Sequence, residues 1–146
     1  MRAAIQEAQK AALKHEVPVG AVLVKDGKVV SRGHNQTEKR QSALTHAEMS
    51  ALAKASKKLK SWRLNDCDLY VTLEPCTMCS GAMVLSRVRN LVYGATDPKA
   101  GAVVSTAQVL DNRKLNHRVQ ITGGILKEEC SALLSDFFRK IRRKAE

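Results

Sequence analysis

The sequence predicts one α/β domain in which helices cover a β-sheet. Strand-like and helix-like segments alternate along the chain, and 146 residues is the length of one ordinary domain. No linker, internal repeat or low-complexity segment divides the sequence, and its three prolines fall at expected segment boundaries. We therefore expect a single domain over residues 1–146.

Four segments are predicted to be helices, and five short apolar runs are predicted to be strands. The expected helices are residues 2–14, 46–58, 77–86 and 127–142. The expected strands are residues 19–24, 29–30, 69–73, 91–93 and 119–121. Asp26-Gly27 predicts a tight hairpin turn, because this pair tolerates the positive φ angles that such a turn requires. Thr45 is the expected N-cap of the second helix.

The composition favours some classes of protein over others. The net charge of +11 fits a polyanionic partner, of which nucleic acid is the commonest. No apolar run approaches the roughly 18 residues of a membrane-spanning helix, and no apolar secretion signal follows the start. We therefore expect a cytoplasmic protein without a membrane partner. A hydrophobic content of 44% argues against a disordered chain.

Basic residues gather in two stretches. The first stretch holds Lys54, Lys57, Lys58, Lys60 and Arg63. The second stretch, near the end of the sequence, holds Arg139, Lys140, Arg142, Arg143 and Lys144. Either stretch alone is equally well explained as a solvated helix face. The two together, with the net positive charge, favour RNA or DNA as a partner.

Two short motifs carry the most informative chemistry: His46-x-Glu48 and, after a proline, Cys76-x-x-Cys79. Each motif lies at the start of an expected helix. One imidazole and two thiolates make a three-residue zinc set, and a catalytic zinc keeps one position for water, whereas a structural zinc normally has four protein ligands. Glu48 is a carboxylate that can take a proton from such a water and pass it to a leaving group.

Each motif also has a simpler explanation. A Cys-x-x-Cys pair alone can be a redox couple or half of a zinc ribbon, and His-x-Glu triplets arise often by chance. Residues two apart on an ideal helix point to different sides, so spacing alone does not bring Glu48 to the water. Together, the two motifs match the signature of zinc deaminases that act on nucleobases. Cys67 and Cys130 lack partner spacing and are interpreted as buried, small apolar residues.

Beyond these motifs, the chain resembles the bacterial tRNA-specific adenosine deaminases of the TadA type, within the cytidine deaminase-like superfamily. The resemblance runs nearly end to end. It is carried by residues 16–24, 69–83, 92–95, 97, 115–117 and 137–139. The segments outside the metal motif are the discriminating ones, because cytidine and guanine deaminases share the motif itself.

The resemblance implies a cytidine deaminase-like three-layer fold, with a five-stranded mixed sheet flanked by helices. It also implies a homodimer whose pockets lie near the subunit interface. The implied ligands of one Zn²⁺ per subunit are His46, Cys76 and Cys79, and the implied proton shuttle is Glu48. The implied substrate contacts are Asn35, Ala47, Val17 and Asp97.

The implied reaction is hydrolytic deamination of adenosine to inosine at the wobble position of a tRNA anticodon, using a zinc-activated water. The implied partner is therefore a tRNA anticodon stem-loop. Asp97 can accept a hydrogen bond from a ribose 2′-OH, but a turn-stabilising role explains it equally well. Phe137 and Phe138 can stack on RNA, although core packing is favoured for at least one of them, and His117 is expected to be structural.

Three other functions stay open. The chain can be a deaminase of another base or nucleoside, such as cytidine or guanine, but its charge argues against a small neutral substrate. It can be a zinc-stabilised RNA-binding subunit, or a variant acting on adenine in single-stranded DNA. Residues 42–45 and Val104 depart from the family pattern of Asp-Pro plus two small residues and of glycine, respectively. These departures concern loop geometry and substrate fit rather than the metal site.

Overall fold

The computed structural model describes all 146 residues and contains one mixed five-stranded sheet with the strand order β2-β1-β3-β4-β5. The strands are β1 (Gly20–Lys25), β2 (Lys28–His34), β3 (Cys67–Leu73), β4 (Asn90–Ala95) and β5 (Gln120–Thr122). β1 pairs antiparallel with β2 and β3, whereas the pairs β3–β4 and β4–β5 are parallel. The predicted mixed sheet of five strands is therefore confirmed.

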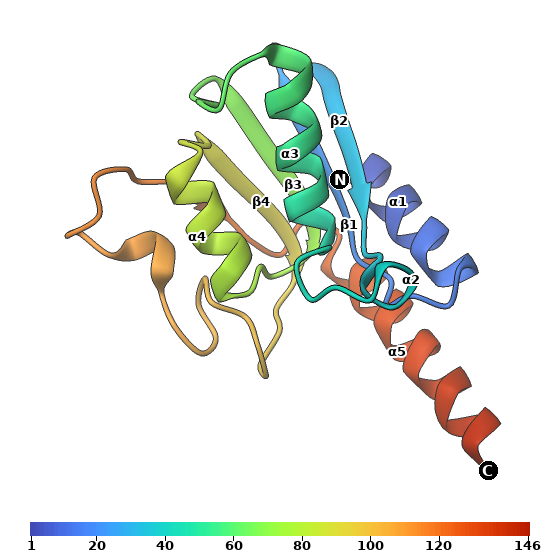
Figure 1. The fold of residues 1–146 in the computed structure, drawn as a ribbon. Helices are drawn as coiled ribbons and strands as arrows, with labels where there is room; N and C mark the ends of the chain where they lie inside the picture. The colour runs from blue at the N-terminus through green and yellow to red at the C-terminus, as the bar shows by residue number, and fades with distance from the viewer.

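Helices cover both faces of the sheet and complete three layers (Figure 1). The helices are α1 (Arg2–Leu13), α2 (Thr37–Arg40), α3 (Ala47–Leu59), α4 (Thr77–Leu85) and α5 (Lys127–Ala145), with a short 3₁₀ turn η1 (Val109–Asp111). α3 and α4 lie side by side over one face, and α1 packs against the other face, where it contacts α5. No helix is long and apolar enough to cross a membrane.

Two glycines let helices lie unusually close to the sheet. A Cβ atom on Gly33 would collide with the backbone of Ala47 and Ala51, and one on Gly20 would collide with the backbone of Ala4 and Ala8. Gly33 therefore fixes the first turn of α3 directly against β2. This turn carries one of the two motifs with site chemistry.

Some local features match the expectations, and others do not. Asp26 and Gly27 have φ angles of 51° and 72°, which confirms the predicted hairpin turn. The prediction of Thr45 as an N-cap is wrong: His46 is the N-cap of α3, and the Thr45 hydroxyl instead donates to the carbonyl of Ser42 at 2.8 Å. The Thr45 side chain thus makes a hydrogen bond within the loop before α3 rather than with the helix. The short α2 and η1 were not expected, because neither segment carries an apolar period.

The remaining cysteines and aromatic residues settle two further expectations. Cys67 and Cys130 are each 1% exposed and form no disulfide, as predicted for buried apolar residues. Phe137 is half-buried on α5 and Phe138 is 41% exposed, so the expectation that at least one of them packs in the core is wrong for this chain. α5 buries only Cys130 in this chain, and its C-terminal half projects from the body of the domain (Figure 1).

Candidate metal centre and pocket

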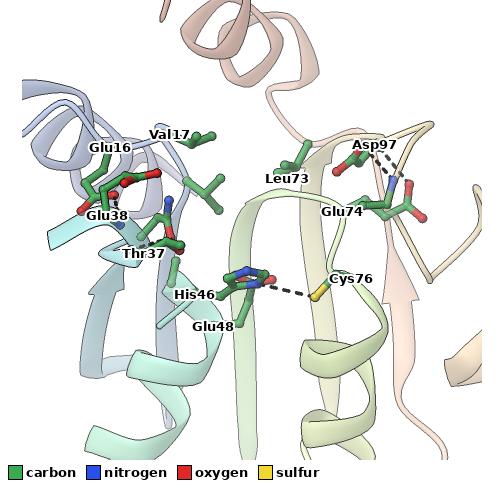
Figure 2. A pocket seen from close by; sticks show the side chains of 14 residues that line it. Glu16, Val17, Thr37, Glu38, His46, Glu48, Leu73, Glu74, Cys76 and Asp97 are labelled. Carbon is green, nitrogen blue, oxygen red and sulfur yellow. Dashed lines mark hydrogen bonds between the residues drawn. The ribbon is translucent and has the colours of Figure 1, made fainter. Parts of the chain in front are cut away.

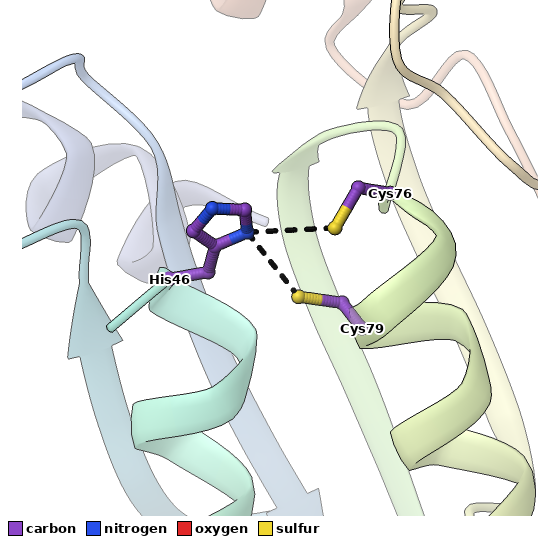
Figure 3. A group of neighbouring side chains, drawn as sticks. All are labelled: His46, Cys76 and Cys79. Atoms are coloured by element: carbon purple, nitrogen blue, oxygen red, sulfur yellow. Dashed lines mark hydrogen bonds between the residues drawn. The ribbon is translucent and has the colours of Figure 1, made fainter. Parts of the chain in front are cut away.

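Three possible metal ligands converge where α3 and α4 begin. The Nδ1 atom of His46 lies 3.5 Å from the Sγ atom of Cys76 and 3.5 Å from the Sγ atom of Cys79 (Figure 3). All three ligand atoms lie within 4.8 Å of one another. Cys76 lies three residues after the end of β3, and Cys79 lies near it because Cys76 is the N-cap and Cys79 belongs to the first turn of α4. The predicted ligand set is therefore assembled in space.

The separation of these atoms fits zinc. A tetrahedral ion with bonds of about 2.3 Å to sulfur and about 2.0 Å to nitrogen keeps such atoms about 3.5 Å apart. Two thiolates balance the charge of a divalent ion. The chain supplies three ligands to a centre that has four positions, which is the arrangement of catalytic rather than structural zinc sites.

The local electrostatics favour a thiolate even without an ion. Cys76 is the N-cap of α4, and Cys79 lies in its first turn, where the positive end of the helix dipole stabilises an anion. Hydrogen bonds from Cys79 and His46 lower the pKa of Cys76 to about 3. The hydrogen bond with Cys76 in turn raises the pKa of His46 and that of Cys79.

Glu48 lies beside His46 in the same pocket (Figure 2). It is 4% exposed, and burial raises the pKa of its carboxyl group. The two residues share a pocket although they are two positions apart, because His46 lies outside the helix with extended backbone angles (φ −70°, ψ 156°). The ideal-helix geometry therefore applies to Glu48 but not to His46.

A pocket of about 270 Å³ opens above these residues. The four residues expected to contact substrate all line it, and they come from four separate parts of the chain: Val17, Asn35, Ala47 and Asp97. Cys79 is fully buried and lies beneath the pocket rather than in its wall. The structure thus brings every predicted site residue to one place.

Hydrogen bonds fix the orientation of Asn35, which is 8% exposed. Its Oδ1 atom accepts from the backbone N–H of Thr37 at 3.3 Å and from the Thr37 hydroxyl at 2.6 Å. The carbonyl of the amide is therefore committed to α2. The Nδ2 atom is left as a hydrogen-bond donor for a ligand.

Asp97 stabilises a turn, which is one of the two roles that its sequence context allows. Its Oδ1 atom accepts from the backbone N–H groups of Lys99 at 3.1 Å and Ala100 at 3.2 Å. The second carboxylate oxygen makes neither of these bonds. His117 also has the expected structural contact, since its Nε2 atom lies 2.7 Å from the carbonyl oxygen of Val88.

Two further buried acidic residues of the pocket were missed by sequence reasoning. Glu16 and Glu74 line the pocket and are each 2% exposed. Glu16 accepts hydrogen bonds from the backbone N–H groups of Glu38 at 3.0 Å and Lys39 at 2.8 Å, so it caps α2. A signal was present for Glu74, because it is a charged residue between an apolar strand and the Pro-Cys motif.

The fold and the three-ligand centre define the class of protein, which is a deaminase domain. A family model of MafB19-like deaminases matches residues 1–142. A solved guanine deaminase from Nitrosomonas europaea shares the fold, with a TM-score of 0.80 and 24% identity over 92% of this chain and 80% of that chain.

Other relatives are much more similar. The tRNA-specific adenosine deaminase of Bacillus subtilis (strain 168) is 49% identical over 144 residues, or 99% of this chain and 89% of the relative. That of Aquifex aeolicus (strain VF5) is 48% identical over 97% of this chain and 93% of the relative. A solved structure from a study of tRNA:A34 deaminases, which edit A to I at the wobble position, has a TM-score of 0.89 and 42% identity, with coverages of 92% and 97%. The chain belongs to the family of tRNA-specific adenosine deaminases.

Proposed function

We propose that this protein converts adenosine to inosine at the wobble position of a tRNA anticodon. The observation that carries this proposal is the pocket in which buried Glu48 lies beside a complete three-ligand zinc set. Relatives with 48–49% identity over almost the whole chain are named for this reaction. A tRNA substrate implies that the protein works in the cytoplasm.

The chemistry divides between the metal and the protein. One zinc ion per subunit, held by His46, Cys76 and Cys79, would supply a water molecule acidic enough to react near neutral pH. Glu48 takes a proton from the attacking water at a carboxylate oxygen and delivers it to N1 of adenine. It then takes the second proton from the hydroxyl group added at C6 and passes it to the amino group, so that the C6–N bond breaks, ammonia leaves and C6 becomes a carbonyl. A raised pKa suits a group that must both accept and release a proton.

The remaining pocket residues orient the base. The free Nδ2 donor of Asn35 can bond an acceptor on the ring, and Val17 and Ala47 supply apolar contact surface. The oxygen of Asp97 that is not engaged in the turn can accept from a 2′-OH, which would favour RNA over DNA. An anticodon loop presents its bases unstacked at little cost, so the target base can enter a pocket of this size.

The two basic stretches lie at opposite ends of the strands (Figure 1). α5 projects from the end at which α3 and α4 begin, whereas residues 57–63 lie where α3 ends. We therefore assign the phosphate contacts to the α5 stretch.

Replacing Arg142 and Arg143 with alanine should weaken stem-loop binding and reduce the salt slope of log K by about 1 to 2. The matched variant with Lys57 and Lys58 replaced should keep the wild-type slope, which fluorescence anisotropy at several salt concentrations measures.

An apolar groove between α3 and α4 fits a second copy of this chain. It is lined by Met49, Leu52, Ala53, Trp62, Ala82 and Leu85. Trp62 is 55% and Leu85 is 73% exposed in the single chain, and the groove lies on the two helices that carry the metal ligands. A symmetric contact here would put two pockets near one interface, as expected for the homodimer.

Sedimentation of the Leu85→Glu variant tests this dimer. The charge should shift the protein toward monomers, because it would be buried against an apolar partner surface. Leu13→Glu is the matched control, since Leu13 is 83% exposed but lies on α1, outside the groove. A dimer of wild-type strength in the Leu85→Glu variant would contradict the assignment.

Mass spectrometry of a treated anticodon stem-loop tests the proposed reaction. We expect a gain of inosine at the wobble position, and no product with free cytidine or guanine. A DNA hairpin of the same sequence tests the alternative that the protein acts on adenine in DNA. A comparable rate on the RNA and DNA hairpins would contradict the proposed preference for RNA. An RNA-binding subunit without catalysis would bind the stem-loop but release no ammonia from any of these substrates.

A further inference from the structure

The carboxylate of Glu74 holds an entire wall of the pocket. Glu74 directly follows β3, and its Oε2 atom accepts from the backbone N–H groups of Val103, Val104 and Ser105 at 3.0, 2.9 and 3.0 Å. Its Oε1 atom accepts from the N–H of Asp97 at 3.0 Å and from the Ser105 hydroxyl. One side chain therefore satisfies donors from both ends of the segment 97–105.

This segment has no helix or strand of its own between residues 97 and 105. Besides its internal turns, its backbone is tied to the preceding chain by the bond from Ala102 N–H to the carbonyl of Pro75 at 2.8 Å. Glu74 and Pro75 immediately precede the metal ligand Cys76. The segment is thus attached at the point where the chain enters the metal centre.

A second observation shows that the segment packs closely around the end of the Glu74 side chain. Gly101 lies so close to the Glu74 carboxyl group that a Cβ atom at residue 101 would overlap all three of its terminal atoms. The φ angle of Gly101 is not in the left-handed region, so the restriction comes from space rather than from backbone conformation. The segment wraps around the anion as tightly as its backbone allows.

The held segment is also the pocket wall opposite α3, since Asp97 and Ala100 line the pocket (Figure 2). Glu74 itself is nearly saturated with donors and has no role left in proton transfer. We propose that Glu74 is a positioning residue for substrate: it fixes the distance between the Asp97 wall and the metal centre, and so determines how well the nucleotide fits. This proposal rests on the proposed deamination reaction and adds a residue that selects its substrate.

The Glu74→Gln variant tests the proposal, because glutamine has the same shape but one acceptor oxygen fewer. Its NH₂ group cannot accept from the backbone donors, so the Asp97 end or the 103–105 end must be released. We expect the KM for the anticodon stem-loop to rise about tenfold, the loss typical of a broken charge-assisted hydrogen bond, while kcat changes less than about threefold. Zinc content should stay at the wild-type level.

Asp68→Asn is the matched control. Asp68 is a hydrogen-bonded carboxylate on β3, the strand that Glu74 follows, but near the end opposite the pocket, where it pairs with Arg89 and Asn90. We expect this variant to keep both kinetic constants. A purely structural Glu74 would instead give a lower melting temperature with unchanged KM, which would overturn the proposal.

Two further measurements cover other outcomes. Ser105→Ala removes a single donor from outside the core and should raise KM about threefold, so it replaces Glu74→Gln if that variant does not fold. Amide hydrogen exchange of residues 97–105 needs no activity: exchange should accelerate in Glu74→Gln and not in Asp68→Asn. If the wild-type protein does not deaminate the stem-loop but exchange is still accelerated in Glu74→Gln, the proposed reaction alone is refuted. If exchange and KM are both unchanged in Glu74→Gln and Ser105→Ala, the positioning role is refuted.

Discussion

Two walls of the pocket each contribute a buried glutamate, and the two side chains behave in opposite ways. Glu48 on α3 is 4% exposed and Glu74 after β3 is 2% exposed. Burial raises the pKa of Glu48. Burial also acts to raise the pKa of Glu74, but hydrogen bonds from Ser105, Val104 and Asp97 outweigh it and lower the pKa to about 2.

The comparison teaches that burial alone does not assign a role to a carboxylate. Glu74 is surrounded by backbone donors that only its anion can satisfy, so it holds structure and keeps its charge. Glu48 has no comparable set of donors and lies next to the metal ligands, so its charge can change. Glu16 resembles Glu74, because it is bonded to the first turn of α2.

The largest expected effect comes from changing one of the three residues proposed to hold zinc beside Glu48. Cys76→Ser replaces a thiolate by a hydroxyl, a far weaker zinc ligand, so zinc content and deamination should both fall to background. Atomic absorption and inosine formation measure the two. Full zinc occupancy in this variant would mean that the ligand set is wrong.

The Glu48→Gln variant tests the glutamate that we propose as the proton carrier. Glutamine keeps the shape but cannot carry a proton between water and base, so turnover should fall by about 10²- to 10⁴-fold. Zinc content and stem-loop affinity should stay near wild type. Single-turnover rates of inosine formation give the result, and a near-normal rate would show that another group moves the proton.

The Ser80→Ala variant contrasts the hydrogen-bonded Glu74 with a buried polar group that has no hydrogen-bond partner. The Ser80 hydroxyl, next to ligand Cys79, is fully buried and makes no hydrogen bond. Its removal should leave the free energy of unfolding unchanged or raise it by about 1 kcal/mol. Urea denaturation measures this change. A clear loss of stability would show that the hydroxyl has a partner in the folded protein.

The smallest effect concerns a carboxylate outside the pocket, Asp68. The hydrogen bonds of Arg89 to Asp68 lower the pKa of this carboxyl group, with a further contribution from Asn90. A carboxyl group whose pKa is lower in the folded state stabilises the fold above its unfolded pKa, and this contribution is lost as the pH falls further. The stability difference between wild type and Asp68→Asn should therefore shrink below about pH 4. Urea titrations from pH 6 to pH 3 would reveal a constant difference if the pair were not ionic.

The sequence was sufficient for the features that depend on residue type or on local pattern. Apolar runs located the strands, and the residue types of His46, Cys76 and Cys79 predicted a metal-binding set whose side chains the structure brings together. It failed at Thr45, because the side chain that caps best locally is not the residue at which the loop geometry starts the helix. Glu74 was missed because its five donors come from residues 23 to 31 positions later, and no local pattern records them.

The close packing of Gly33 against the start of α3 also affects the position of His46. A methyl group at residue 33 would overlap the backbone of Ala47 and Ala51 and would have to push the helix away from the sheet. His46 begins that helix, so the displaced helix would carry the imidazole away from the two sulfur atoms on α4. A side chain 13 residues before His46 would therefore disturb both the packing of α3 on the sheet and the spacing of the proposed metal ligands.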